Sequence, residues 1–312
     1  MIAKLKDPSI WGRHLAVAAA YAACYEVTKY FSFSHWVLPA GLRVACLLLV
    51  PRKFWPALAV GEMLPLAEFA LMHSAMFGAA WAALMAIPPI ALAMPIVAAL
   101  KRRMELLRPD GQINMSLILV ASLLCAGIST AINCTALSVL TMPDGSPSPP
   151  ITLQTVLVWV LGYFLGSLSI APSILAVHQR MSRIAGEITF NHVIRSPLLR
   201  EVLRIELPVL ITLLIGASFV GGDALPYFRI GMAIPVIVLA WRFEWHGAAI
   251  GGLLASSFQA ATATTLRDPA MIQAQVVLAM VLSGALMLGA RSARRHASEC
   301  KASKPQQTGQ AS

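Results

Sequence analysis

The sequence predicts an all-α fold, a polytopic bundle of about eight to ten transmembrane helices. The mean hydropathy of the 312 residues is +0.72, and only 12% of them are charged, which is too few to cover a soluble protein of this size. The apolar residues fall into roughly ten stretches, each near the length of about 20 residues that crosses a hydrocarbon core about 30 Å thick. Only helices and closed barrels satisfy their backbone groups in lipid. Runs such as residues 79–86 lack the alternation of barrel strands, so helices are expected.

The expected spans can be placed in order from the N-terminus. The first is a full-length apolar run without a cleavage site, so it is not a signal peptide. The second and third are joined by a basic turn around Pro51, and the fourth ends before the basic residues 101–103. A Pro/Ser-rich loop at 144–150 separates the fifth from the sixth. Prolines inside spans such as Pro95 and Pro172 are tolerated in buried membrane helices. The ten stretches are 14–31, 35–50, 54–72, 75–100, 115–142, 151–177, 203–221, 225–242, 246–264 and 269–290.

The net charge of +10 is distributed unevenly along this series. If the N-terminus is cytoplasmic and the spans alternate, nearly all loop cations fall on the cytoplasmic side, as they do in membrane proteins generally. The opposite side receives Arg267 as its single loop cation, together with Asp144, Asp223 and Asp268. This predicts a bacterial inner-membrane protein with both termini in the cytoplasm. The basic residues then face anionic membrane lipids rather than nucleic acid, for which no binding module is visible.

Two charged residues lie inside adjacent predicted spans, where a charge costs roughly 2.5–3.5 kcal/mol at the centre of the bilayer. Arg43 precedes the basic turn by about nine residues and Glu62 follows it by about nine, so both lie roughly 13 Å from the turn. An antiparallel hairpin can therefore bring them together. Two interpretations remain open: a structural pair that locks the hairpin, or a pair that lines a ligand pocket and shifts during signalling.

A second polar group is expected near the opposite, outer face. Glu26 and Lys29 share a helix face at the i, i+3 spacing. The others stand at the ends of spans and at comparable heights: His35, Glu68, His73 and Arg229. Ordinary interfacial polarity explains such residues. The alternative is a periplasm-facing pocket for a small polar ligand, which histidines could make sensitive to pH.

Nothing in the sequence indicates catalysis or a cofactor. Cys24, Cys46, Cys125, Cys134 and Cys300 have neither CxxC nor metal-ligand spacing, so no metal site or disulfide framework is predicted. No P-loop, Ser-His-Asp or HExxH pattern appears. The short polar tail after residue 290 is too small for a catalytic domain. The protein is therefore expected not to be an enzyme.

Three segments resemble the MASE1 family, an integral-membrane sensory domain of bacteria. The first runs from His35-Trp36-Val37-Leu38-Pro39-Ala40-Gly41-Leu42-Arg43 to Phe54-Trp55-Pro56 and Glu62. The second comprises Trp159 to Gly162, Gly166, Ala171 and Pro172, and the third residues 226–249 with Ala240-Trp241-Arg242-Phe243. The family's internal motif often reads Gly-Asp-x-x-Gly, whereas this chain has Tyr163 at the acidic position.

The resemblance implies signal input, with residues 1–296 as the sensory domain and 297–312 as a short cytoplasmic tail, expected to be disordered. Such domains usually precede an output enzyme, and here none follows. The partner would then be a histidine kinase, a diguanylate cyclase or another membrane signalling protein, reached through lateral helix contacts such as the Gly247/Gly251 face. A small-solute transporter, or a membrane subunit of one, is the alternative function. A purely structural partner of another membrane protein is a third possibility.

Overall fold

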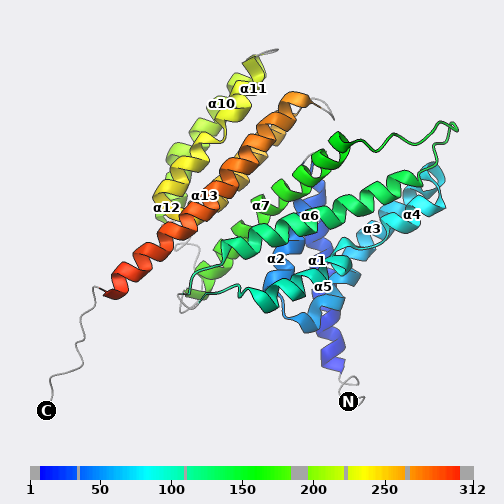
Figure 1. The fold of residues 1–312 in the computed structure, drawn as a ribbon, viewed down its shortest axis with the longest axis horizontal. Coiled ribbons are helices and arrows are strands. Elements are labelled where there is room, and N and C mark those ends of the chain that lie inside the picture. Colours follow the sequence, from blue (N-terminus) through cyan, green and yellow to red (C-terminus); the bar gives the residue numbers. More distant parts are fainter. Residues whose placement is uncertain are drawn as a thin grey trace. The chain divides into compact units, whose positions relative to one another are not determined.

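The computed structural model describes residues 8–33, 36–108, 111–183, 196–220, 224–263 and 268–302, and within these ranges the chain consists of helices joined by loops (Figure 1). The α-helices are α1 (Pro8–Tyr30), α2 (Leu38–Leu49), α3 (Trp55–Phe77), α4 (Ala79–Met85), α5 (Pro89–Arg103), α6 (Met115–Ser138), α7 (Leu153–Arg183), α9 (Pro197–Glu201), α10 (Leu207–Phe219), α11 (Leu225–Gly231), α12 (Ile234–Ala261) and α13 (Pro269–Ala302). A 3₁₀ turn, η2 (Arg52–Phe54), precedes α3, and a π-helical turn, η3 (Val202–Glu206), lies between α9 and α10.

The chain divides into two compact units, which are described separately. Unit 1 comprises residues 1–103 and 119–174, and unit 2 comprises residues 104–118 and 175–312. The division falls within α6 and α7. Both units are built from apolar helices, as the all-α prediction requires.

Seven helical stretches of the described chain are long and apolar enough to cross a membrane, which confirms a multi-pass membrane protein. They are Arg52–Phe77, Ala79–Arg103, Met115–Ser138, Leu153–Ser182, Pro197–Phe219, Leu225–Ala261 and Pro269–His296. Helix α1 is 23 residues long but does not belong to this set. The predicted fourth span is interrupted between α4 and α5, where Pro88 and Pro89 follow one another.

The expected second span, 35–50, is wrong as a span. Helix α2 has 12 residues, about 18 Å at 1.5 Å per residue, which does not reach across a hydrocarbon core of about 30 Å. Ten of its residues, from Leu38 to Leu48, are buried. The apolar sequence of α2 therefore reflects burial inside unit 1 rather than contact with lipid, which hydropathy alone does not distinguish.

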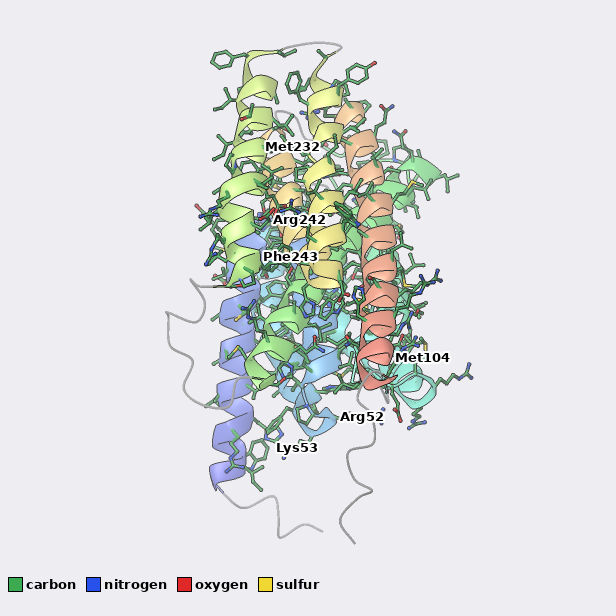
Figure 2. All side chains as sticks on the ribbon, turned by 90° about the vertical axis from the view of Figure 1, so that its left-hand side faces the viewer. Arg52, Lys53, Met104, Met232, Arg242 and Phe243 are labelled. Carbon is green, nitrogen blue, oxygen red and sulfur yellow. The ribbon has the colours of Figure 1, made fainter. Side chains whose placement is uncertain are left out.

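Helix α12 is two arms of a hairpin rather than one continuous rod. Phe243 and Glu244 have non-helical dihedral angles, and Glu244 has φ 55° and ψ −142°. A Cβ atom on Gly247 would collide with the backbone carbonyl oxygen of Leu239. Residues eight positions apart in a continuous helix are separated by about 12 Å, so the chain must reverse here. The stretch 225–261 thus contains the two predicted spans 225–242 and 246–264, and Phe243 marks the turn in Figure 2.

The same close approach buries the face of Gly247 and Gly251, which was expected to contact a partner protein. Both glycines are buried inside unit 2. A Cβ on Gly251 would lie 3.0 Å from Glu206 Oε1 and 3.3 Å from the Cα of Val236. The small residues of this arm therefore serve packing within the unit, as small-xxx-small spacing permits. The prediction that this face couples to a partner is wrong.

Helix α13 continues beyond the expected end of the last span near residue 290 and ends at Ala302. It packs on the second arm of α12, where Gly289 meets the backbone of Trp245 and Gly252 meets Leu282. His296 Nδ1 lies 2.8 Å from Glu244 Oε1 at the hairpin turn. Part of the segment expected to be a disordered tail, 297–302, is thus helical, and residues 303–312 lie outside the described chain.

Candidate functional site

Arg43 and Glu62 form a buried ion pair in unit 1. Arg43 Nε and Nη2 both donate to Glu62 Oε1, at 2.9 and 2.5 Å. Arg43 is 2% exposed and Glu62 is fully buried. The equal spacing of the two residues from the turn at Pro51 therefore predicted their contact correctly. A charge pair in this setting is stable only when its remaining polar atoms are also satisfied.

Two further hydrogen bonds connect this pair to neighbouring helices. Arg43 Nη1 donates to Ser129 Oγ at 2.8 Å, and the Ser129 hydroxyl donates to the Cys125 carbonyl. Glu62 Oε2 accepts the backbone N–H of Ile90 at 2.9 Å. That N–H belongs to the first turn of α5, where helical N–H groups have no internal partner and an anion is favourable. The ion pair thus joins α2, α3, α5 and α6.

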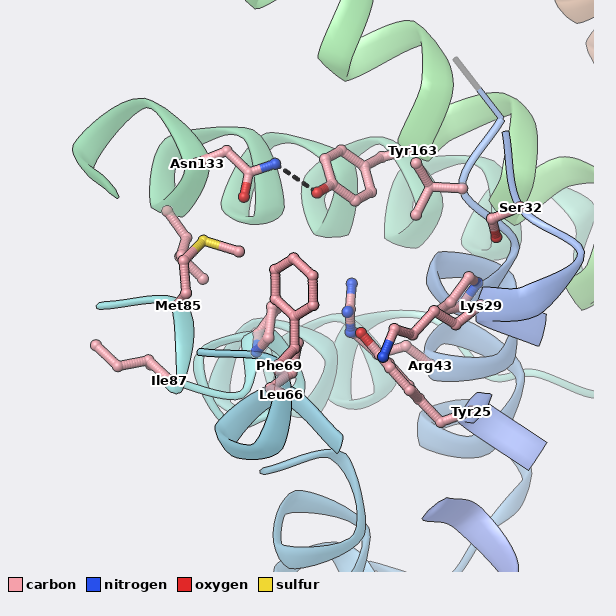
Figure 3. Close-up of a pocket in the computed structure, with 14 residues that line it drawn as sticks. Tyr25, Lys29, Ser32, Arg43, Leu66, Phe69, Met85, Ile87, Asn133 and Tyr163 are labelled. Atoms are coloured by element: carbon pink, nitrogen blue, oxygen red, sulfur yellow. Dashed lines mark hydrogen bonds between the residues drawn. The ribbon is translucent and has the colours of Figure 1, made fainter. Parts of the chain in front are cut away.

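Arg43 also contributes to the wall of a pocket of about 190 Å³ in unit 1 (Figure 3). The pocket lies where α1 ends, α2 begins and α4 gives way to α5. Most of its wall is apolar. The complete lining is Tyr25, Lys29, Ser32, Val37, Pro39, Arg43, Leu66, Phe69, Met85, Ile87, Pro89, Ile132, Asn133 and Tyr163.

The polar groups of the pocket come from both sides. The side chains of Tyr25, Lys29 and Arg43 point toward the same space in Figure 3. Across from them, Asn133 Nδ2 donates to the Tyr163 hydroxyl at 2.6 Å. Lys29 Nζ lies 3.1 Å from Glu26 Oε1 and 5.5 Å from the centre of the Phe69 ring. Tyr163 stands where the family motif often carries Asp, so this wall carries a phenol instead of a carboxylate.

Glu68 and His73, two other members of the expected outer group, do not join this pocket. Glu68 is exposed on α3. The His73 ring lies 2.8 Å from the Phe69 carbonyl oxygen through Nδ1 and stacks on Phe77. Neither residue lines the pocket. His35 lies outside the described residues, so its predicted position remains a prediction.

Arg229 belongs to unit 2 and has its own partners. It is fully buried and forms an ion pair with Asp268 through Nη1. Its Nε donates to Thr262 Oγ1 at 3.0 Å and its Nη2 to the Thr262 carbonyl at 2.8 Å. Asp268 Oδ1 in turn accepts the Ala270 N–H at 3.0 Å, as an N-cap of α13 does. The cluster joins Thr262, just after α12, and Asp268, just before α13, to Arg229 on α11.

Asp268 gives this cluster a defined dependence on pH. Burial raises the pKa of its carboxyl, but the hydrogen bond and charge of Arg229 and the backbone N–H groups of Ala270 and Met271 outweigh it, so the pKa lies below its usual value. A depressed folded-state pKa contributes stability above the unfolded value of about 3.9, which is lost as pH falls through the folded pKa.

We therefore expect Asp268→Asn to lower the free energy of unfolding by about 1.5–3 kcal/mol at neutral pH, because Arg229 loses a charged acceptor. The difference between the variant and the wild type should shrink as pH drops below about 4. Thermal unfolding in detergent across this range measures it. A difference that stays constant with pH would show that the carboxylate charge is not what stabilises this cluster.

Four residues that the structure places in the pocket or buries as a charge were not among the site residues expected from the sequence. Tyr25, Asn133 and Tyr163 line the pocket, and uncharged side chains give no signal in an apolar sequence. Glu206 was detectable by the rule that singled out Arg43, since it is a charge inside a predicted span. It is 1% exposed, and neither of its carboxylate oxygens has a hydrogen-bond partner in the part of the chain that the structure describes.

Comparison with known proteins identifies the family. The MASE1 family model matches residues 15–296, nearly the whole chain. No curated protein and no solved structure matches the sequence. Among the described residues, no group of three or more His, Cys, Asp or Glu side chains could hold a metal ion. The matched range includes every residue that lines the pocket, and the chain belongs to the MASE1 family of membrane-associated sensory domains.

Proposed function

We propose that this protein is a signal-input module of the bacterial inner membrane that binds its stimulus in the pocket of unit 1 and acts through a partner protein. It has no enzymatic activity of its own in this proposal. The observation that carries the proposal is that one buried side chain, Arg43, serves both the pocket wall and the ion pair that joins four helices.

The pocket wall explains how occupancy would become a signal. Its residues come from all seven helices α1 to α7 and from the α1–α2 and α4–α5 connections. A ligand that binds one arrangement of these helices better than another shifts the equilibrium between them, and it can do so only by its difference in affinity. Closely packed helices have discrete arrangements rather than continuous ones, so a small ligand can bias the whole unit.

The partner in this proposal is a histidine kinase, a diguanylate cyclase or another membrane signalling protein. Purification in mild detergent should recover such an enzyme with the chain, and deletion of the chain should change that enzyme's regulated output. The purified chain alone should show no kinase, cyclase or phosphodiesterase activity. Recovery without a signalling enzyme, combined with movement of a solute into proteoliposomes, would support the transporter alternative instead.

The orientation is part of the proposal: the basic residues that follow the last span favour a cytoplasmic C-terminus. Reporter fusions after Ser148 and after Lys304 are expected to report opposite sides of the membrane. Between these points the α12 hairpin makes the number of crossings five, whereas a continuous α12 would make it four. A fusion after Arg242 supplies the control, since it should report the same side as Lys304. Equal signals from Ser148 and Lys304 would contradict the hairpin as two crossings.

A further inference from the structure

We propose that the pocket of unit 1 binds a small organic anion with one carboxylate and an apolar or aromatic body. This inference rests on the proposed sensory function and names its ligand class. Arginine has five N–H groups in a planar fork, and hydrogen bonds to Glu62 and Ser129 account for three of those of Arg43. Arg43 lines the pocket while remaining 2% exposed.

The second donor is Lys29, which reaches the pocket from α1. It makes an exposed ion pair with Glu26, whose carboxylate does not line the pocket. An ammonium group has three donors, so this contact does not exhaust it. The Tyr25 hydroxyl points toward the same space in Figure 3. Two cationic side chains and a phenol thus converge, while the carboxylates that balance their charge, Glu26 and Glu62, stand outside the lining.

The rest of the wall selects an apolar body for the ligand. Leu66, Phe69, Met85, Ile87 and Ile132 supply most of it, and Phe69 adds an aromatic ring to this apolar wall. The volume of about 190 Å³ is below the roughly 300–1,000 Å³ of sites for drug-sized molecules, so the ligand is a small metabolite. A carboxylate that meets both guanidinium and ammonium groups forms charge-assisted hydrogen bonds, which are the strong ones. A neutral amide of the same shape does not.

The test uses the full chain in lipid nanodiscs and the probe phenylacetate, with phenylacetamide as its neutral counterpart. Phenylacetate should raise the thermal midpoint in a concentration-dependent way, as a ligand that binds the folded state does, and phenylacetamide should not. Equal shifts for both probes, or no shift by about 10 mM phenylacetate, would overturn the carboxylate assignment. A shift with inorganic phosphate or oleate but not with phenylacetate would also overturn it.

Variants locate the binding. Lys29→Met should weaken phenylacetate affinity by about tenfold or more, which corresponds to the loss of one charge-assisted hydrogen bond. Lys53→Met is the matched control, because Lys53 lies 5.1 Å from the Phe54 ring much as Lys29 lies over Phe69, but it is outside the pocket. It should leave the affinity unchanged. Equal losses for both lysines would show a general charge effect and overturn the site.

Tyr25→Phe keeps the shape of the wall and provides a second variant should Lys29→Met disturb folding. It should weaken phenylacetate binding severalfold without changing the midpoint of the free protein. Unchanged binding in both pocket variants would overturn the proposal. If phenylacetate does not bind but the chain still regulates a partner's output, only this ligand class is refuted. If phenylacetate binds but the chain has no effect on any signalling enzyme, the sensory function is refuted.

Discussion

Glu62→Gln is expected to lower the free energy of unfolding by about 3–5 kcal/mol, and Arg43→Met by a similar amount. Each change leaves the other charge buried without its counterpart, and that uncompensated charge is what makes breaking such a pair costly. Glu62→Gln also weakens the acceptor for the Ile90 N–H at the start of α5. Titration with a denaturing detergent, followed by helical signal, measures the loss.

The double variant Arg43→Met/Glu62→Leu should lose far less than the sum of the single variants, because neither charge remains. Additive losses would contradict the direct interaction. Exchanging the two charges should not restore stability. An arginine at position 62 cannot accept the Ile90 N–H, and a glutamate at position 43 cannot serve both the partner arginine and Ser129 in the same geometry.

Glu206→Gln is the matched control for Glu62→Gln. Both residues are buried glutamates inside candidate spans, but Glu206 has no charged partner within the described chain. Its substitution removes a carboxylate without orphaning a cation, so the change should stay within about 1 kcal/mol or be stabilising. A loss as large as that of Glu62→Gln would show that burial of any glutamate, rather than its pairing with Arg43, determines the effect.

Gly166→Ala is expected to destabilise unit 1 by about 1–3 kcal/mol, the usual cost of overpacking. A Cβ at this position would collide with the backbone carbonyl oxygen of Val37, just before α2. The Val37 N–H donates to the Gly162 carbonyl at 3.2 Å, which holds the two backbones together. Because the obstacle is backbone, a side-chain rotation cannot relieve it. Denaturing-detergent titration again gives the change.

Gly127→Ala, on α6 of the same unit, is expected not to destabilise the protein. No heavy atom lies within 4 Å of the position its Cβ would take. The substitution should therefore be neutral or stabilise by up to about 1 kcal/mol, since alanine favours helix over glycine. If both alanine variants changed stability in the same direction, the close approach at Gly166 would not be what sets the cost.

Much of this architecture could be predicted because lipid imposes strict rules on sequence. A charge inside an apolar run stands out, and two such charges equally far from one turn must lie at similar depth. This is why Arg43 and Glu62 could be paired in advance. Glu26 and Lys29 follow from helical geometry in the same way, and the structure places them 3.1 Å apart.

Other features could not be predicted, for identifiable reasons. Hydropathy reports that a segment avoids water, so α2, which avoids water by lying among other helices, looks like a span. The spacing of Gly247 and Gly251 predicts a close approach but not which helix approaches. The equal height expected for Arg229 and His73 does not specify which residues touch, and Arg229 pairs with Asp268 in unit 2.

The sequence by itself determined the membrane class, the helical fold and the principal ion pair, because the cost of burying charge and backbone in lipid leaves few solutions. Only the tertiary structure decided that α2 is a buried core helix and that Glu206 packs against Gly251. The pocket, too, was decided only by the tertiary structure. Tyr25, Phe69, Asn133 and Tyr163 lie on different helices, and their convergence depends on how those helices pack, which is set by side-chain shape across long sequence separations.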